Sequence, residues 1–127
     1  MTTAPFDPLG FPADLLTAQR AAAELYAALH THQAALSWSR DPHPGWPQDG
    51  QRPGRPETPG WTAEEGVEYD RLLSALREAT ATVQCHGWWK RCKEEGIRGT
   101  DVFVARQALK RAPGAVPLLQ GDAEQPA

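Results

Sequence analysis

The 127-residue chain has little of what defines the common protein classes, and each absence argues against one of them. It holds only two cysteines, Cys85 and Cys92, too few for the disulfide framework of a small secreted domain. No apolar run approaches the roughly 20 residues that span a bilayer, so no membrane segment is expected. Residues 1–10 contain no Lys or Arg and no apolar stretch, so we expect no signal peptide there. The chain is therefore predicted to be cytoplasmic, with reduced thiols.

Large aliphatic residues are also scarce. Leu, Ile, Val and Phe together number 21, whereas Ala alone numbers 20. The formal net charge is only −3, so strong net charge, the second mark of a disordered chain, is missing. This composition predicts one small helical domain with a thin core and little apolar surface left to shape an enzyme cleft.

Two long segments have the three-and-four spacing of apolar residues that is typical of helices. The first begins at Pro12 and is expected to run to about Ser39. The second begins at Thr62, which with Glu65 matches a capping box, and is expected to break near Gly87. Their apolar stripes are best buried against each other, which predicts a long antiparallel helical hairpin.

Two shorter helices are expected after the break. One runs through Trp88 and Cys92 and ends at Gly96, and the last begins at Thr100 or Asp101 and runs to Ala112. The predicted fold is all-α, with three to four helices: the long hairpin and a C-terminal helical pair that completes its core. Self-association into a homodimer would complete the core equally well.

The predicted domain organisation has three parts, the second of which contains a long loop. Residues 1–11 form an extended lead-in, residues 12–112 a single helical domain, and residues 113–127 a flexible acidic tail that carries Asp122 and Glu124. Within the domain, residues 41–60 hold six prolines and four glycines, a density that argues against any regular element. A structureless loop of this length is usually functional or disordered.

No pattern typical of a catalytic or metal site is present. The chain lacks a CxxC pair, a GxSxG elbow and a glycine-rich phosphate loop. His30 and His32 lie about 200° apart on a helix, and the adjacent Cys85 and His86 diverge, so neither pair is placed for chemistry. We expect no cofactor and no metal, and a metal- or thiol-dependent enzyme is the least favoured interpretation.

Positive charge is concentrated near the C-terminus. Residues 86–112 carry seven Lys and Arg against three acids, whereas residues 61–85 carry five acids against two arginines. Within this basic segment, Cys92, Gly96, Ile97, Val102 and Ala105 occupy the small, Gly and aliphatic positions of a helix-turn-helix unit, which residues 88–112 resemble. The resemblance implies a DNA-binding regulator with Arg98, Arg106, Lys110 and Arg111 as the contacts to the duplex.

The pair Trp88 and Trp89 supports a different interpretation. Neighbouring indoles on a helix point about 100° apart, so one is expected in the core and the other partly exposed. An exposed Trp beside Lys90 and Arg91 has the composition of a protein-interface hot spot. These four residues are the predicted interaction surface.

In composition and predicted architecture the chain resembles small all-helical proteins of GC-rich actinobacterial genomes and their mobile elements. From the thin core and the composition of residues 88–91 we expect a non-enzymatic cytoplasmic interaction or accessory protein that binds a protein partner through these residues. The helix-turn-helix-like DNA-binding regulator is the alternative.

Overall fold

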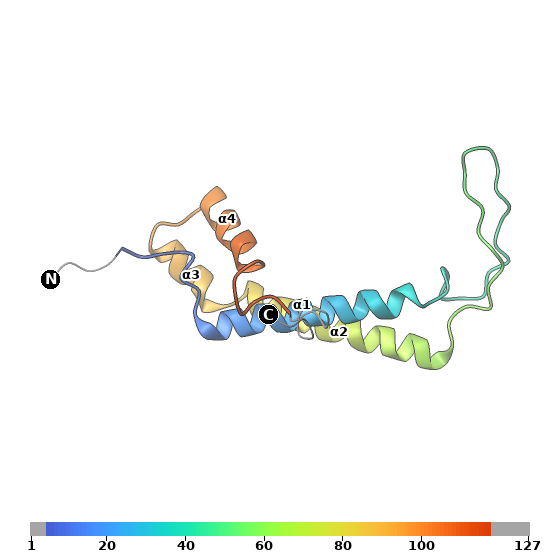
Figure 1. The fold of residues 1–127 in the computed structure, drawn as a ribbon, viewed down its shortest axis with the longest axis horizontal. Helices are drawn as coiled ribbons and strands as arrows, with labels where there is room; N and C mark the ends of the chain where they lie inside the picture. Colours follow the sequence, from blue (N-terminus) through green and yellow to red (C-terminus); the bar gives the residue numbers. More distant parts are fainter. Residues whose placement is uncertain (1–4, 118–127) are drawn as a thin grey trace, which may run out of the picture. The chain divides into compact units, whose positions relative to one another are not determined.

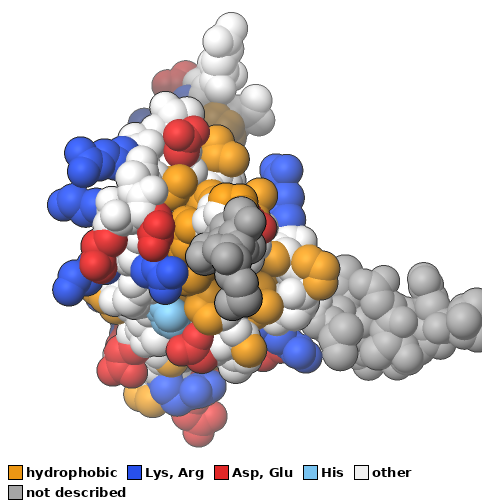
Figure 2. All heavy atoms as spheres, turned by 90° about the vertical axis from the view of Figure 1, so that its left-hand side faces the viewer, with side chains coloured by type: hydrophobic (Ala, Val, Ile, Leu, Met, Phe, Trp, Pro, Cys, Tyr) orange, Lys and Arg blue, Asp and Glu red, His pale blue; other side chains and the backbone are white. Residues whose placement is uncertain are grey.

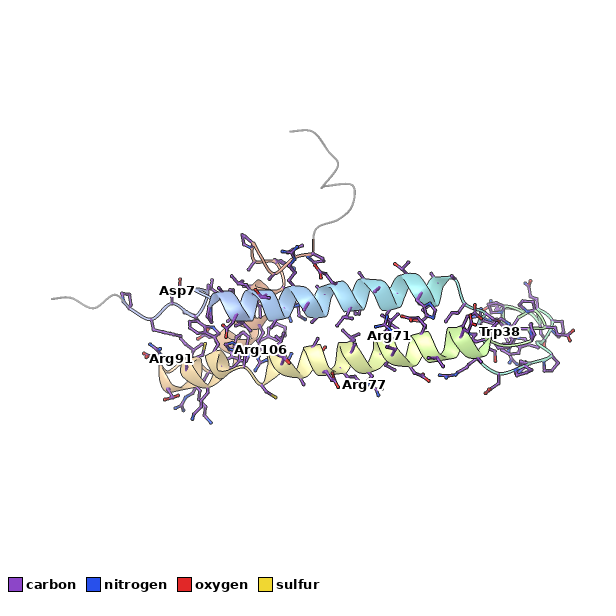
Figure 3. All side chains as sticks on the ribbon, turned by 90° about the horizontal axis from the view of Figure 1, so that it is seen from below. Asp7, Trp38, Arg71, Arg77, Arg91 and Arg106 are labelled. Atoms are coloured by element: carbon purple, nitrogen blue, oxygen red, sulfur yellow. The ribbon has the colours of Figure 1, made fainter. Side chains whose placement is uncertain are left out.

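The fold is all-α in a computed structural model that describes residues 5–117. Four helices follow in order: α1 (Ala13–Ala34), α2 (Ala63–Gln84), α3 (Gly87–Glu94) and α4 (Thr100–Leu109). Helices α1 and α2 run antiparallel, side by side (Figures 1 and 3). The predicted fold class, a helical hairpin followed by a helical pair, is confirmed.

The chain divides into two compact units that share the long helices. Unit 1 comprises residues up to Tyr26 together with those from Ala75 onward, and unit 2 comprises Ala27–Ser74. None of the helices in residues 5–117 has the length and apolar character needed to cross a membrane.

The core of unit 1 joins all four helices. Its buried residues are Leu15, Ala22, Val83, Trp89, Cys92, Ala105, Leu109 and Ala115. Ala115 is fully buried, so the packed part of the chain extends beyond residue 112 into the predicted tail. The remainder of that tail, with Asp122 and Glu124, lies outside the described residues.

The ends of the helices follow from individual side chains. Thr62 and Glu65 form the predicted capping box, since each side-chain oxygen accepts the other residue's backbone N–H, at 3.1 and 2.8 Å. Helix α3 ends in the Schellman arrangement around Gly96, where the Ile97 N–H donates to the Cys92 carbonyl at 2.9 Å and Gly96 has φ +87°.

The C-terminal ends of α1 and α4 differ from the prediction. Helix α1 ends at Ala34 instead of near Ser39, because Ser37 is hydrogen-bonded to the segment that precedes α2: its hydroxyl pairs with that of Thr58 and its carbonyl accepts the Trp61 indole N–H. Helix α4 begins at Thr100, one of the two predicted starts, with Gly99 as its N-cap, and it ends at Leu109 instead of Ala112. Gly99 has φ +57°, a conformation that residues with a Cβ rarely adopt.

Residues 40–61, between α1 and α2, form an antiparallel ribbon in unit 2, which we call the proline ribbon (Figure 1). Residues 41–60 contain no helix or strand, as the proline density predicts, but backbone hydrogen bonds pair them, so the segment is not a structureless loop. Three pairs of residues exchange both backbone hydrogen bonds, at 2.8 to 3.1 Å: His43 with Thr58, Trp46 with Arg55, and Asp49 with Arg52. A fourth contact joins the Trp61 N–H to the Arg40 carbonyl at 2.8 Å.

These paired positions, or rungs, recur every third residue, whereas rungs of an antiparallel β-ladder recur every second residue. A three-residue repeat is the period of the polyproline II helix. All six prolines fall between rungs, where their missing N–H costs no pairing. The ribbon reverses through Gly50 and Gln51, and Gly50 has the positive φ (+59°) of the first residue in a type II′ turn.

Candidate functional site

Of the two predicted interaction tryptophans, one lies in the core and the other is partly exposed, as expected. Trp89 is 7% exposed, and its indole N–H donates to the Val83 carbonyl at 2.7 Å. Trp88 is half-buried: its ring centroid lies 5.0 Å from that of Phe6, and its N–H donates to the Pro8 carbonyl at 3.3 Å. Both indoles therefore stabilise unit 1, and the charged side chains of Lys90 and Arg91 form the exposed part of this set.

The four residues predicted to contact DNA differ in exposure and in their contacts. The Arg106 guanidinium carbon lies 4.4 Å from the Trp89 ring centroid, and the side chain donates to Gln84, so it serves the packing of unit 1. Arg98, Lys110 and Arg111 are exposed.

The outer face of α4 is apolar where a recognition helix would carry its contacts, since Phe103 is 61% and Val104 52% exposed. Figure 2 faces the side of the molecule where α3 and α4 lie. Hydrophobic atoms occupy its middle, and Lys and Arg are interspersed with Asp and Glu around them. The view shows no continuous basic patch among the described residues.

The thiol and imidazole groups do not converge. Cys92 is fully buried, which raises the pKa of its thiol, whereas Cys85 is exposed. His86 caps α3, because its Nδ1 accepts the Trp88 N–H at 3.0 Å and its Nε2 therefore carries the proton that is donated to Asp14 at 3.1 Å. This hydrogen bond holds the pKa of the Asp14 carboxyl below its ordinary value.

His32 is engaged elsewhere, since its Nε2 donates to the Glu65 carbonyl at 3.1 Å, and it does not meet His86. Within residues 5–117 no group of three His, Cys, Asp or Glu side chains is placed to hold a metal ion.

The surface that sequence reasoning missed is one face of the proline ribbon. Trp38, just before the ribbon, packs edge-on against both His43 and Trp46, with ring centroids 4.9 and 5.3 Å away. The centroids of His43 and Trp46 are themselves 5.8 Å apart. Rung side chains of this strand therefore gather on one face, as a three-residue period requires. Figure 3 shows Trp38 within this dense group of side chains.

Arginines of the returning strand cover these rings. The guanidinium carbon of Arg52 lies 4.7 Å from the Trp46 ring centroid, and that of Arg55 lies 5.7 Å from the Trp38 centroid. Cation–π contacts of this kind are favourable by about 0.5–1 kcal/mol at exposed sites. The indole N–H groups of Trp38 and Trp46 point to the ribbon's own backbone, donating to the Pro56 and Pro53 carbonyls at 2.9 and 3.0 Å.

The base of the ribbon is anchored to α2. Arg40 makes a two-pronged ion pair with Asp70, both contacts at 2.8 Å, and its guanidinium lies 5.3 Å from the Trp61 ring centroid. This pairing holds the pKa of the Asp70 carboxyl below its ordinary value. The Trp61 N–H donates to the Ser37 carbonyl at 2.8 Å, and Ser37 in turn shares a short hydroxyl hydrogen bond with Thr58, which is buried.

The prolines are displayed outward. All six are exposed: Pro42, Pro44, Pro47, Pro53, Pro56 and Pro59. The ribbon thus combines an aromatic and arginine face, held by its own hydrogen bonds, with exposed proline rings. One signal in the sequence could have revealed it: positions 40, 43, 46, 49, 52, 55, 58 and 61 contain no proline although the segment is dense in it.

Comparison with known proteins gives a family and no function. Residues 14–112 match the family described as a domain of unknown function, DUF8825, and the chain belongs to it. No curated protein and no solved structure matches the chain.

Proposed function

We propose that this chain is a non-enzymatic, cytoplasmic interaction or accessory protein that binds a protein partner through the proline ribbon. The observation that carries the proposal is the order of the ribbon: its rungs, stacked rings and indole hydrogen bonds hold exposed prolines and arginines in place before any partner arrives. Trp and Arg are the residue types most enriched at interface hot spots.

Preorganisation is what makes such a surface useful. Ordering a side chain on binding costs about 0.5–1.5 kcal/mol for each rotamer-rich group. The stacking of Arg52 and Arg55 on Trp46 and Trp38 restricts these side chains in advance. A polyproline-type strand is likewise recognised at low entropic cost, because its backbone is already extended.

Site-specific photo-crosslinking in the protein's native cells tests the proposal. A photoreactive residue replaces Gln48 or Gln51 of the ribbon, or Gln33 on α1 as the matched control, all three being exposed. We expect one protein to crosslink at both ribbon positions and not at Gln33. The purified partner should bind the intact chain and lose at least about tenfold in affinity, about 1.4 kcal/mol, when the ribbon is distorted by Gly45→Ala.

Two results would refute this role: equal crosslinking at all three positions, or a purified partner that binds the Gly45→Ala variant as tightly as the unmodified chain.

A second candidate function is duplex DNA binding through residues 88–112. The burial of Cys92 and Ala105 between α3 and α4 favours it, because the corresponding small residues are buried in a helix-turn-helix unit. Binding should weaken steeply with salt, since each phosphate contact releases a counterion. Phosphate contacts are strongest at low salt, so the test is an anisotropy titration at about 50 mM salt. If it detects no binding, this function is excluded.

A further inference from the structure

Five arginines stack on aromatic rings, and they fall into two groups. Arg40, Arg91 and Arg106 each also hold a side-chain acceptor, namely Asp70, Glu95 and Gln84. Arg52 and Arg55 stack on Trp46 and Trp38, and within residues 5–117 neither has an ion pair or a side-chain hydrogen bond. Three of these five arginines are therefore paired with an acceptor within the protein, and two are not.

A guanidinium held against an indole can still pair with a carboxylate. A guanidinium that lies over an indole keeps its N–H donors in its own plane, where they are open to a planar acceptor. Guanidinium and carboxylate groups pair through two parallel hydrogen bonds, as Arg40 and Asp70 do here at 2.8 Å.

The spacing of the pair defines the ligand further. Arg52 and Arg55 occupy successive rungs on the same strand, three residues apart. One turn of polyproline II also takes three residues and rises about 9 Å, at 3.1 Å per residue. An extended peptide with acidic residues three apart would therefore present its carboxylates in step with the two arginines.

We propose that Arg52 and Arg55 bind an acidic, extended peptide segment of the partner whose carboxylates are spaced three residues apart. This inference rests on the proposed function and specifies the chemistry of the partner. A peptide fits better than a nucleic acid because the ribbon exposes its own carboxylates, Asp49 beside Arg52 and Glu57 beyond Arg55. A strand with a phosphate on every nucleotide would meet these acids, whereas spaced carboxylates with neutral residues between them avoid them.

Synthetic peptides test the spacing directly. The probe is acetyl-(Glu-Pro-Pro)4-amide, labelled for fluorescence anisotropy and titrated with the full chain at low salt, where exposed charges are least screened. Acetyl-(Glu-Glu-Pro-Pro-Pro-Pro)2-amide has the same composition and charge with different spacing, and acetyl-(Gln-Pro-Pro)4-amide has no charge. We expect the first peptide to bind at least about tenfold more tightly than the second, the low end of the range for one charge-assisted contact, and the third not to bind.

Variants locate the site. Arg52→Gln and Arg55→Gln should each weaken binding of the spaced peptide by about tenfold, the scale of one charged hydrogen-bonded pair. Arg77→Gln is the matched control, because Arg77 is an exposed arginine on α2 outside the ribbon. Near-UV circular dichroism of the tryptophans should be retained in all three variants. Arg52→Lys, which keeps the charge but not the planar fork, should also weaken binding.

The proposal would be overturned if the spaced peptide did not bind, if both acidic peptides bound equally, or if the Arg52→Gln, Arg55→Gln double variant bound as the unmodified chain does. Tighter binding of single-stranded oligothymidine, dependent on the same arginines, would overturn it in favour of a nucleic acid. If one of these results were obtained while a protein still crosslinked specifically to the ribbon, only the proposal of an acidic ligand would be refuted. Loss of that crosslink would refute the proposed function itself.

Discussion

At the scale of single residues, two glycines of the proline ribbon meet different constraints. Gly45 has φ +74°, and a Cβ added there would lie 2.3 Å from the Arg55 carbonyl oxygen, which belongs to the facing strand. Gly50 has φ +59°, but a Cβ there would meet nothing within 4 Å. The first position combines backbone strain with a collision against a rung, whereas the second carries strain alone.

We predict that Gly45→Ala distorts the ribbon, because its collision is with backbone that cannot rotate away. Gly50→Ala should cost only about 1–3 kcal/mol, the usual cost of holding a residue with a Cβ in a sparsely populated backbone conformation. Near-UV circular dichroism of the tryptophans, followed during thermal unfolding, measures both effects. Equal losses in the two variants would mean that contact between the strands does not hold the ribbon together.

At the scale of elements, the ribbon should have a hydrogen-exchange pattern that no β-hairpin shows. The amides of the rungs, His43, Trp46, Asp49, Arg52, Arg55, Thr58 and Trp61, donate to backbone carbonyls. We predict that these amides are protected, and that the amides of Asp41, Gln48, Gln51, Gly54 and Glu57, which lie between rungs, exchange fast. Exchange measured by NMR at residue resolution tests this three-residue period. Protection of every second residue, or of none, would contradict it.

The helices and the ribbon also show what the sequence could and could not predict. The start of α2 was predictable because Thr62 and Glu65 satisfy each other's backbone N–H groups locally. The end of α3 was predictable because Gly96 supplies the left-handed turn. The ribbon was not predicted, because prolines were interpreted one at a time as breakers, whereas their placement between rungs is a property of the pair of strands.

The packing partners of Trp88 and Trp89 could not be predicted for a related reason. Helix α3 is only eight residues long, and two of its faces are covered: Trp89 donates to Val83, and Trp88 packs on Phe6, which lies 82 positions earlier. Contacts at that separation leave no trace in the local spacing of residues. The ring-stacked arginines of the ribbon were missed in the same way, since each stacks on a ring of the opposite side of the turn.

At the scale of the whole molecule, the division into two compact units has a thermodynamic consequence. Leu109 is 1% exposed in the core of unit 1, and the ribbon belongs to unit 2. Leu109→Ala should destabilise unit 1 by about 2–5 kcal/mol, the range for truncating a buried leucine. We predict that protection of the amides in α3 and α4 falls, while the rung amides of the ribbon keep theirs. An equal loss of protection throughout would show that the two units unfold as one.

The three-residue repeat of the rungs also limits how the length of the ribbon can change. On both strands, two residues separate each rung from the next, and one of the two is a proline. The turn at Gly50 and Gln51 joins the two strands. Inserting a single residue would shift the register of one strand, so that residues that now lie between rungs occupied the hydrogen-bonding positions and every aromatic ring beyond the insertion left the shared face. The ribbon can therefore be lengthened or shortened only by six residues at a time, a triplet on each strand, and each such step extends or removes one layer of the aromatic and arginine stack.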